Sequence, residues 1–139
     1  MHLVDTSVWI QTLRRPGAPA IQAALRPLIL AGQVMITELI ILELMCGIRK
    51  TERADTLLRR FEALERPGFS DGQWHEAWIL AAKLRKAGVT PTATDCLIAT
   101  MAIAHHATLV HCDTDFEAIA EHSPLQTLNW TQLVKSKTS

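Results

Sequence analysis

The sequence predicts an α/β fold with a central parallel sheet of about four to five short strands, flanked by helices on both faces. Two observations lead to this prediction. Short apolar segments rich in β-branched residues, such as residues 34–37 and 108–112, alternate along the chain with longer stretches of helical periodicity. Each helix then returns the chain to the same end of the sheet, and this connection makes neighbouring strands parallel.

Each element is expected from local signals, taken in chain order. Strands are expected at residues 2–5, 34–37, 108–112 and 125–128. Helices are expected at residues 6–13, 20–31, 38–49, 52–64, 71–87, 94–106 and 115–120. Gly32 and Gly88 are the expected stop signals of two helices, and Pro67-Gly68 separates two others.

Length and composition are those of one globular domain. The chain has 139 residues, enough for a hydrophobic core, and we expect a single domain over residues 1–134 with a polar tail at 135–139. Hydrophobic residues make up 48% and charged residues 20%, which excludes a disordered protein. Because 14 Lys and Arg balance 14 Asp and Glu, strong non-specific binding to nucleic acid is not expected.

The sequence also indicates a cytoplasmic protein with no membrane partner. The N-terminal residues lack the basic and apolar regions of a signal peptide. Residues 34–45 are apolar but short, and they include Glu38 and Glu43, so this segment is unsuited to span a bilayer. The three cysteines, Cys46, Cys96 and Cys112, have no metal-binding spacing and are expected as buried thiols in a reducing compartment.

Acidic residues interrupt or directly follow the apolar segments, namely Asp5, Glu43, Asp95, Asp113 and Asp115. A carboxylate in an apolar environment is costly to bury unless it is paired or binds a metal. Several carboxylates placed together repel one another, unless a cation supplies positive charge. Asp5 and Asp113 end predicted strands, and open α/β sheets bind ligands at the carboxyl ends of their strands. These residues therefore predict an acidic pocket that holds Mg²⁺ or Mn²⁺.

Simpler structural roles are open for several residues. Asp5, Asp95 and Asp115 could each cap a helix, because Asp is common in that role. Glu38 fits the first turn of a helix better than a metal site. Trp74 and Trp78, four residues apart, indicate core or interface packing rather than stacking on bases.

The acidic residues lie in segments that resemble the motifs of the PIN-domain ribonucleases, most closely the VapC-type toxins of toxin–antitoxin pairs, over nearly the whole chain. The similar segments are Val4-Asp5-Thr6-Ser7, Glu43 with Gly47, Thr94-Asp95-Cys96-Leu97-Ile98-Ala99 and Asp113-Thr114-Asp115-Phe116. They occur in the family's order and at suitable separations. One departure is that the family usually has Thr or Ser two positions before Asp113, where this chain has His111.

The resemblance implies a PIN-like fold and a set of site residues. The implied catalytic residues are Asp5, Glu43, Asp95, Asp113 and Asp115, of which Asp5, Asp95 and Asp113 are the expected metal ligands. Thr6 and Ser7 either cap a helix or hydrogen-bond the acidic residues. Candidates for contacts with the RNA backbone are Arg14, Arg15, Arg49 and Lys50, with an ordinary solvated surface as the alternative.

The implied function is a Mg²⁺- or Mn²⁺-dependent endoribonuclease, the toxin of a type II toxin–antitoxin pair. Metal-activated water would cleave structured RNA, either tRNA or rRNA. The implied partners are a VapB-type antitoxin, the RNA substrate and a second copy of the chain. In such a homodimer, exposed apolar helix faces would be covered.

Three other functions fit the sequence less well. A housekeeping PIN-domain nuclease for RNA processing would need the same residues, but the small size of the chain favours the toxin. A phosphatase using Asp113 and Asp115 would need Thr or Val two positions after the second Asp, where Glu117 stands. A catalytically dead binding module would have lost an acidic residue, and all of them are present.

Overall fold

The computed structural model describes residues 1–13, 17–49 and 51–135. Its strands are β1 (His2–Val4), β2 (Val34–Met35), β3 (Thr108–His111) and β4 (Gln126–Asn129). Its helices are α1 (Thr6–Leu13), α2 (Pro19–Leu30), α3 (Glu38–Gly47), α4 (Thr51–Glu62), α5 (Asp71–Lys86), α6 (Ala93–Ala104), α7 (Asp115–Glu121) and α8 (Thr131–Lys135).

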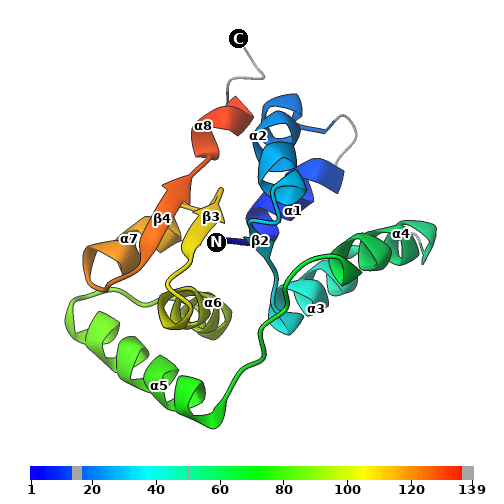
Figure 1. Ribbon diagram of the computed structural model, residues 1–139. Helices are drawn as coiled ribbons and strands as arrows, with labels where there is room; N and C mark the ends of the chain where they lie inside the picture. Colours follow the sequence, from blue (N-terminus) through cyan, green and yellow to red (C-terminus); the bar gives the residue numbers. More distant parts are fainter. Residues whose placement is uncertain (14–16, 50, 136–139) are drawn as a thin grey trace.

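The strands form one four-stranded parallel sheet in the order β2-β1-β3-β4, which confirms the predicted fold class. From β1, the chain first adds β2 on one side of the sheet. It then crosses back past β1 to add β3 and β4 on the other side. Because crossovers between parallel strands are right-handed, this reversal places α1 and α2 on one face and α6 and α7 on the other. Figure 1 shows α2 and α8 above the sheet and α6, with α5 beyond it, below the sheet.

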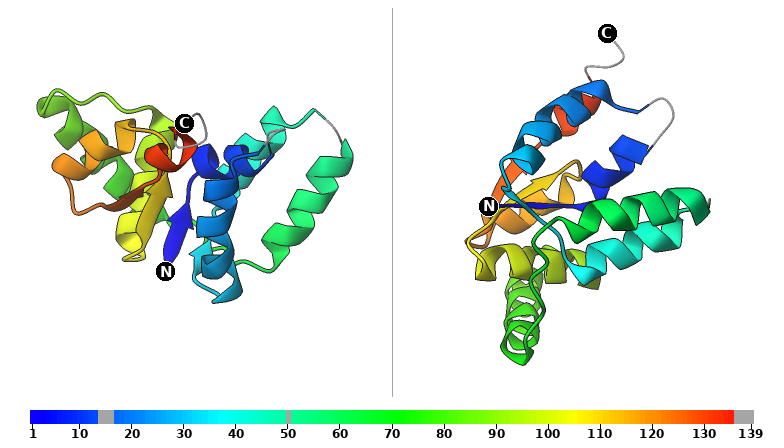
Figure 2. Two further views of the ribbon diagram at one scale, coloured as in Figure 1. Left: turned by 90° about the horizontal axis from the view of Figure 1, so that it is seen from above. Right: turned by 45° about the vertical axis from the view of Figure 1, so that its right-hand side comes forward.

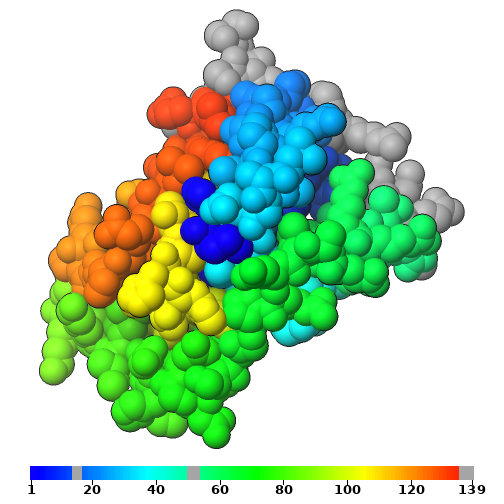
Figure 3. Space-filling view, in the orientation of Figure 1, coloured from blue at the N-terminus to red at the C-terminus, as the bar shows by residue number. Residues whose placement is uncertain are grey.

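The central strands are buried on both faces, as expected for a parallel sheet covered by helices. Leu3 and Val4 of β1 and Leu109 and Val110 of β3 have no solvent exposure. Figure 3 shows the N-terminal segment, in dark blue, between the segments that contain β2 and β3. The two views in Figure 2 show the helices around this sheet from other sides. The core therefore surrounds β1 and β3, the two strands whose ends carry Asp5 and Asp113.

Local capping explains where several helices begin or end. The Thr37 hydroxyl accepts a hydrogen bond from the Ile40 N–H at the start of α3, and Ser70 and Gln73 form a capping box at the start of α5. After α2 and α5, Gly32 and Gly88 adopt positive φ angles of 67° and 82°, as the sequence predicted for two stop signals. Other limits differ slightly, since α3 ends at Gly47 rather than at residue 49. The short helix α8 was not predicted.

Two packing predictions were wrong in part. Trp74 and Trp78 are 46% and 67% exposed, because α5 turns the stripe Ala77, Leu80 and Leu84 toward the core instead. The two tryptophans therefore do not pack in the core, and interface packing stays a prediction. Among the cysteines, Cys96 is buried but Cys46 is exposed. No helix in the described ranges is long and apolar enough to cross a membrane.

Candidate active site

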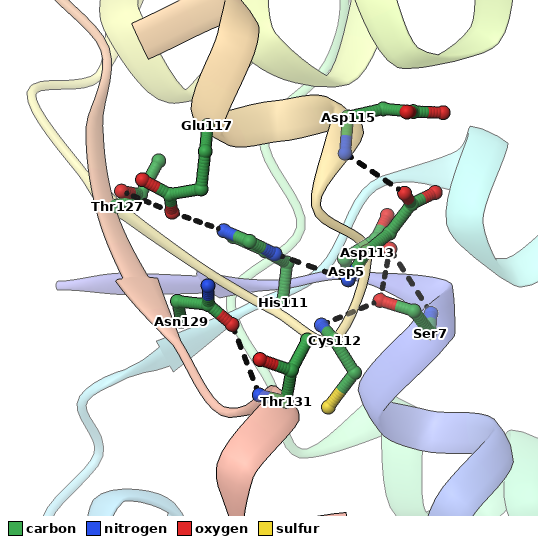
Figure 4. Close-up of polar contacts among 10 residues, drawn as sticks. All are labelled: Asp5, Ser7, His111, Cys112, Asp113, Asp115, Glu117, Thr127, Asn129 and Thr131. Carbon is green, nitrogen blue, oxygen red and sulfur yellow. Dashed lines mark hydrogen bonds and ion pairs between the residues drawn. The ribbon is translucent and has the colours of Figure 1, made fainter.

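The carboxyl ends of β1 and β3 lie side by side and bring the first acidic residue into the site. The Asp5 N–H donates to the Val110 carbonyl oxygen at 2.9 Å, so the two strand ends are joined. The Ser7 hydroxyl donates to Asp5 Oδ2 at 2.6 Å and accepts from the Cys112 N–H at 2.9 Å (Figure 4). This end of the sheet is also where the strand order reverses, and open α/β sheets bind ligands at such a point.

Asp5 shows the capping contact that the sequence offered as one alternative for this residue. Its Oδ2 accepts a second hydrogen bond, from the Ser7 N–H at 3.0 Å, in the manner of a helix cap. The side chain is only 4% exposed, and both of these bonds go to the same oxygen. Capping therefore fixes the orientation of the carboxylate.

Asp113 and Asp115 form the second part of the site, in the turn between β3 and α7. The Asp115 N–H donates to Asp113 Oδ1 at 3.0 Å. Thr114 is the N-cap residue of α7 and Asp115 is its first helical residue, so the predicted alternative of a capping role for Asp115 is wrong. Asp113 is half-buried, whereas Asp115 is exposed.

Asp95 reaches the same place from the first turn of α6. The cap of this helix is Thr92, whose hydroxyl accepts from the Asp95 N–H at 3.1 Å, so the alternative of Asp95 as the cap is also wrong. Within the described residues, one carboxylate oxygen from each of Asp95, Asp113 and Asp115 lies within 4.8 Å of the other two. We call these three residues, together with Asp5 and Glu43, the acidic cluster.

Glu43 joins the acidic cluster from α3. Its Oε1 accepts a hydrogen bond from the Thr6 hydroxyl at 2.8 Å, across 37 residues of sequence. Thr6 and Ser7 therefore each hold one acidic side chain, Glu43 and Asp5 respectively. This is the supporting role that the sequence offered as one of two alternatives for these residues.

The pKa values of three carboxylates in the acidic cluster are raised, by burial and by the negative charges of their neighbours. Burial, followed by the negative charges of Asp5 and Asp113, raises the pKa of Asp95 to about 6. Burial also raises the pKa of Asp5 despite its hydrogen bonds from Ser7, and Asp113 adds to the increase. The pKa of Glu43 is raised by burial and by the charge of Asp5. In the described part of the chain an ion pair joins Glu38 to Arg66 and a hydrogen bond joins His111 to Glu117, and neither contact involves the acidic cluster.

This donor set fits a hard divalent cation. Mg²⁺ and Mn²⁺ prefer carboxylate oxygens, and a cation would offset both the burial of these negative charges and the repulsion that together raise the pKa values of Asp5, Glu43 and Asp95. Among the residues that the structure describes, Asp95, Asp113 and Asp115 form a group that could hold such a cation. The sequence predicted Asp5 as a ligand in place of Asp115, and Asp5 interacts with Asp113 and Asp95 through its charge. Glu38 lies in the first turn of α3, as the sequence predicted, and it also pairs with Arg66 at 2.8 Å.

Of the four basic residues that are candidates for contacts with RNA, one lies within the described residues. Arg14, Arg15 and Lys50 lie outside the described residues. Arg49 is exposed and follows the end of α3.

Sequence reasoning did not find three other polar residues around the site. Thr92 could have been found, because Thr92 followed by Asp95 has the spacing of a capping box. Glu117 contacts the side chain of His111, and Thr127 contacts Glu117, in the tertiary structure. No local pattern in the sequence indicates these contacts.

Known proteins with similar sequences and structures identify the family. A family model described as the PIN domain matches residues 2–122. A VapC ribonuclease of Mycobacterium bovis is 34% identical over 129 residues, which cover 91% of this chain and 96% of that protein. Ribonuclease VapC11 of Mycobacterium tuberculosis has the same identity and the same coverage of both chains, 34%, 91% and 96%.

Solved structures agree with this assignment at the level of the fold. FitAcB from Neisseria gonorrhoeae superposes with a TM-score of 0.77 at 24% identity, over 93% of this chain and 97% of that chain. VapBC2 from Rickettsia felis, bound to a promoter DNA fragment, superposes with a TM-score of 0.76 at 24% identity, over 93% and 98%. The chain therefore belongs to the PIN-domain family, among the VapC ribonucleases.

Proposed function

We propose that this protein is a divalent-metal-dependent endoribonuclease and the toxin of a type II toxin–antitoxin pair. The observation that carries the proposal is the acidic cluster itself, in which carboxylates from β1, α3, α6 and the β3–α7 turn converge at the carboxyl end of the sheet. The kinship with VapC ribonucleases supports cleavage of RNA as the reaction. The proposed substrate is structured RNA of the translation machinery, either tRNA or rRNA.

Asp95, Asp113 and Asp115 would hold Mg²⁺ or Mn²⁺, with Asp5 and Glu43 beside them. A bound divalent cation makes a coordinated water more acidic and offsets negative charge on the phosphoryl oxygens of the substrate. Ser7 holds Asp5, and Thr6 holds Glu43, each through a hydrogen bond shorter than 3 Å. These bonds limit the rotation of the two carboxylates, so the side chains need little reorganisation when a cation or the RNA arrives.

The proposed protein partner is a VapB-type antitoxin. Solved structures with this fold include a toxin–antitoxin complex from Klebsiella pneumoniae and VapBC from Salmonella typhimurium bound to DNA. A segment that blocks this site must neutralise several carboxylates, so we propose that an antitoxin side chain points into the acidic cluster. Arg suits this role better than Lys, because its guanidinium group binds a carboxylate through two hydrogen bonds.

Cleavage of purified tRNA and rRNA by the isolated protein tests the enzymatic part. We expect cleavage with Mg²⁺ or Mn²⁺, none in excess EDTA, and none from Asp95→Asn. Asp55→Asn is the matched control, because Asp55 is an exposed carboxylate on α4 and should be dispensable. Equal cleavage by Asp95→Asn and Asp55→Asn would overturn the proposed site.

The genomic context and a co-expression assay test the toxin assignment. A short neighbouring reading frame for a DNA-binding protein is expected, and its product should suppress both the growth arrest and the RNA cleavage. A housekeeping nuclease would have no such neighbour, and its expression would not arrest growth.

A further inference from the structure

His111 occupies an unusual position beside the acidic cluster. It is the last residue of β3, its side chain has no solvent exposure, and it lies two residues before Asp113. Its Nδ1 is 3.1 Å from the Asp113 backbone N, and its Nε2 is 2.7 Å from Glu117 Oε1. The Thr127 hydroxyl of β4 donates to the same Glu117 oxygen at 2.9 Å. Figure 4 shows these contacts as one connected path from Thr127 to Asp113.

The chemistry of the partners fixes the direction of each hydrogen bond. The Asp113 backbone N–H can only donate, so Nδ1 of His111 must accept and carries no proton. The ring proton is therefore on Nε2, which donates to Glu117. Glu117 Oε1 accepts from both the His111 ring and the Thr127 hydroxyl, as a carboxylate oxygen can. With the ring proton on Nε2, every donor and acceptor in this path therefore has a hydrogen-bond partner.

The path holds the turn that carries two of the acidic residues. Asp113 in turn accepts from the Asp115 N–H, so one hydrogen-bonded series runs from β4 to the first residue of α7. The His111 ring also packs against Phe116, with ring centroids 5.4 Å apart, and its carbonyl oxygen accepts from the Trp130 N–H at 2.8 Å. A turn anchored in this way cannot move independently of the sheet.

We propose that His111 is a positioning residue for the acidic cluster. Nδ1 holds the Asp113 peptide, Glu117 holds the imidazole ring, and Thr127 holds Glu117. Asp113 and Asp115 are thereby presented to a divalent cation together with Asp95. The inference rests on the proposed function, because it assumes that a cation binds at the acidic cluster. A purely structural histidine would instead contribute only to folding.

Two substitutions of His111 distinguish the role of Nδ1 from the role of Nε2. In His111→Asn the side-chain oxygen can replace Nδ1 as the acceptor for the Asp113 N–H, since Asn commonly accepts from the backbone two residues ahead. In His111→Gln the amide nitrogen can replace Nε2 as the donor to Glu117, but the acceptor for Asp113 is lost. Both variants lose the packing of the ring, so a general loss of stability should affect them alike.

The measurement is the Mn²⁺ affinity of the purified protein, by calorimetry or by electron paramagnetic resonance, together with thermal unfolding in EDTA. We expect His111→Gln to weaken Mn²⁺ binding about 10- to 100-fold, the usual effect of losing a residue that orients a metal ligand, and His111→Asn to weaken it only about threefold. Thr127→Val should weaken it several-fold, because Glu117 would lose one of its two donors. Thr108→Val, at the opposite end of β3, is the matched control and should leave the affinity unchanged.

Each outcome decides a different point. Unchanged Mn²⁺ affinity in His111→Gln, or equal losses in both His111 variants that follow their loss of stability, would overturn the inference alone. If neither His111 variant folds, Thr127→Val decides, and an affinity equal to that of Thr108→Val would overturn the inference. A wild-type protein that binds no Mn²⁺ would overturn the proposed function and this inference together.

Discussion

Asp95→Asn should stabilise the metal-free protein and inactivate the enzyme at the same time. The substitution keeps the size and shape of the side chain but removes one negative charge from the acidic cluster. In the absence of a cation, the Asp95 carboxylate is half-buried and repelled by Asp5 and Asp113, and its pKa is raised from 3.8 to about 6. The wild-type protein therefore retains a destabilising charge that the variant lacks.

The size of this effect follows from the pKa values. A difference of one pKa unit corresponds to about 1.4 kcal/mol, so ionised Asp95 lowers the free energy of unfolding by about 3 kcal/mol at most. Because the pKa is raised in the folded state, the folded protein binds more protons, and stability falls as the pH rises from about 4 to about 6. Solvent screening of this partly exposed group and the remaining burial of the Asn amide reduce the expected gain to about 1 kcal/mol. For a domain of this size, that gain raises the Tm by about 3 °C.

Thermal unfolding in excess EDTA checks the prediction. The Tm of Asp95→Asn should exceed that of the wild type by about 3 °C near neutral pH, and the difference should shrink near pH 4, where folded Asp95 keeps its proton. Asp55→Asn is the control, since this exposed side chain on α4 lies outside the acidic cluster. In the cleavage assay, Asp95→Asn should be more than about 100-fold slower, beyond the usual effect of losing an outer partner of a metal ligand. A variant that is less stable in EDTA at both pH values would refute the electrostatic reasoning, and wild-type turnover would remove Asp95 from the site.

Three further predictions concern metal binding, association and the core. Mg²⁺ at about 100 times its Kd should stabilise the wild type by about 2.7 kcal/mol in thermal unfolding, and an equal increase in Asp5→Asn and Asp113→Asn would indicate a non-specific salt effect. The exposed apolar face of α5, with Trp78 at 67% exposure, should be covered in a homodimer. Light scattering should therefore give a dimer for the wild type and a monomer for Trp78→Lys, whereas a wild-type monomer at high concentration would contradict the dimer. Phe61→Ala should lower the free energy of unfolding by about 3–5 kcal/mol, because Phe61 is 1% exposed and packs edge-on against Trp9. Denaturant titration measures this loss, and a loss below about 1 kcal/mol would contradict the packing.

The sequence by itself determined the order and type of most elements and the identity of the acidic residues. Apolar periodicity, caps and glycine stop signals act within a few residues, so they can be read locally. Asp5 directly follows β1, and Asp113 lies two residues beyond the end of β3. Because parallel strands end at one edge of a sheet, the positions of these two residues in the sequence are enough to predict that they lie near each other. These features predicted the parallel α/β fold, whereas the resemblance to PIN-domain ribonucleases rests on the four segments that contain the acidic residues.

Only the tertiary structure decided which acidic residues approach most closely and what holds them. The oxygens of Asp95, Asp113 and Asp115 form the tightest group, because α6 directs its first turn at the β3–α7 turn, while Ser7 holds Asp5 at the start of α1. Likewise, Glu117 of α7 meets both His111 of β3 and Thr127 of β4, because these two strands lie side by side. The rotation of α5, which leaves Trp78 exposed, also depends on the helices that pack against it. Such distances depend on the relative placement of elements to within an ångström or so, and that placement is set by the packing of the whole core rather than by any local pattern.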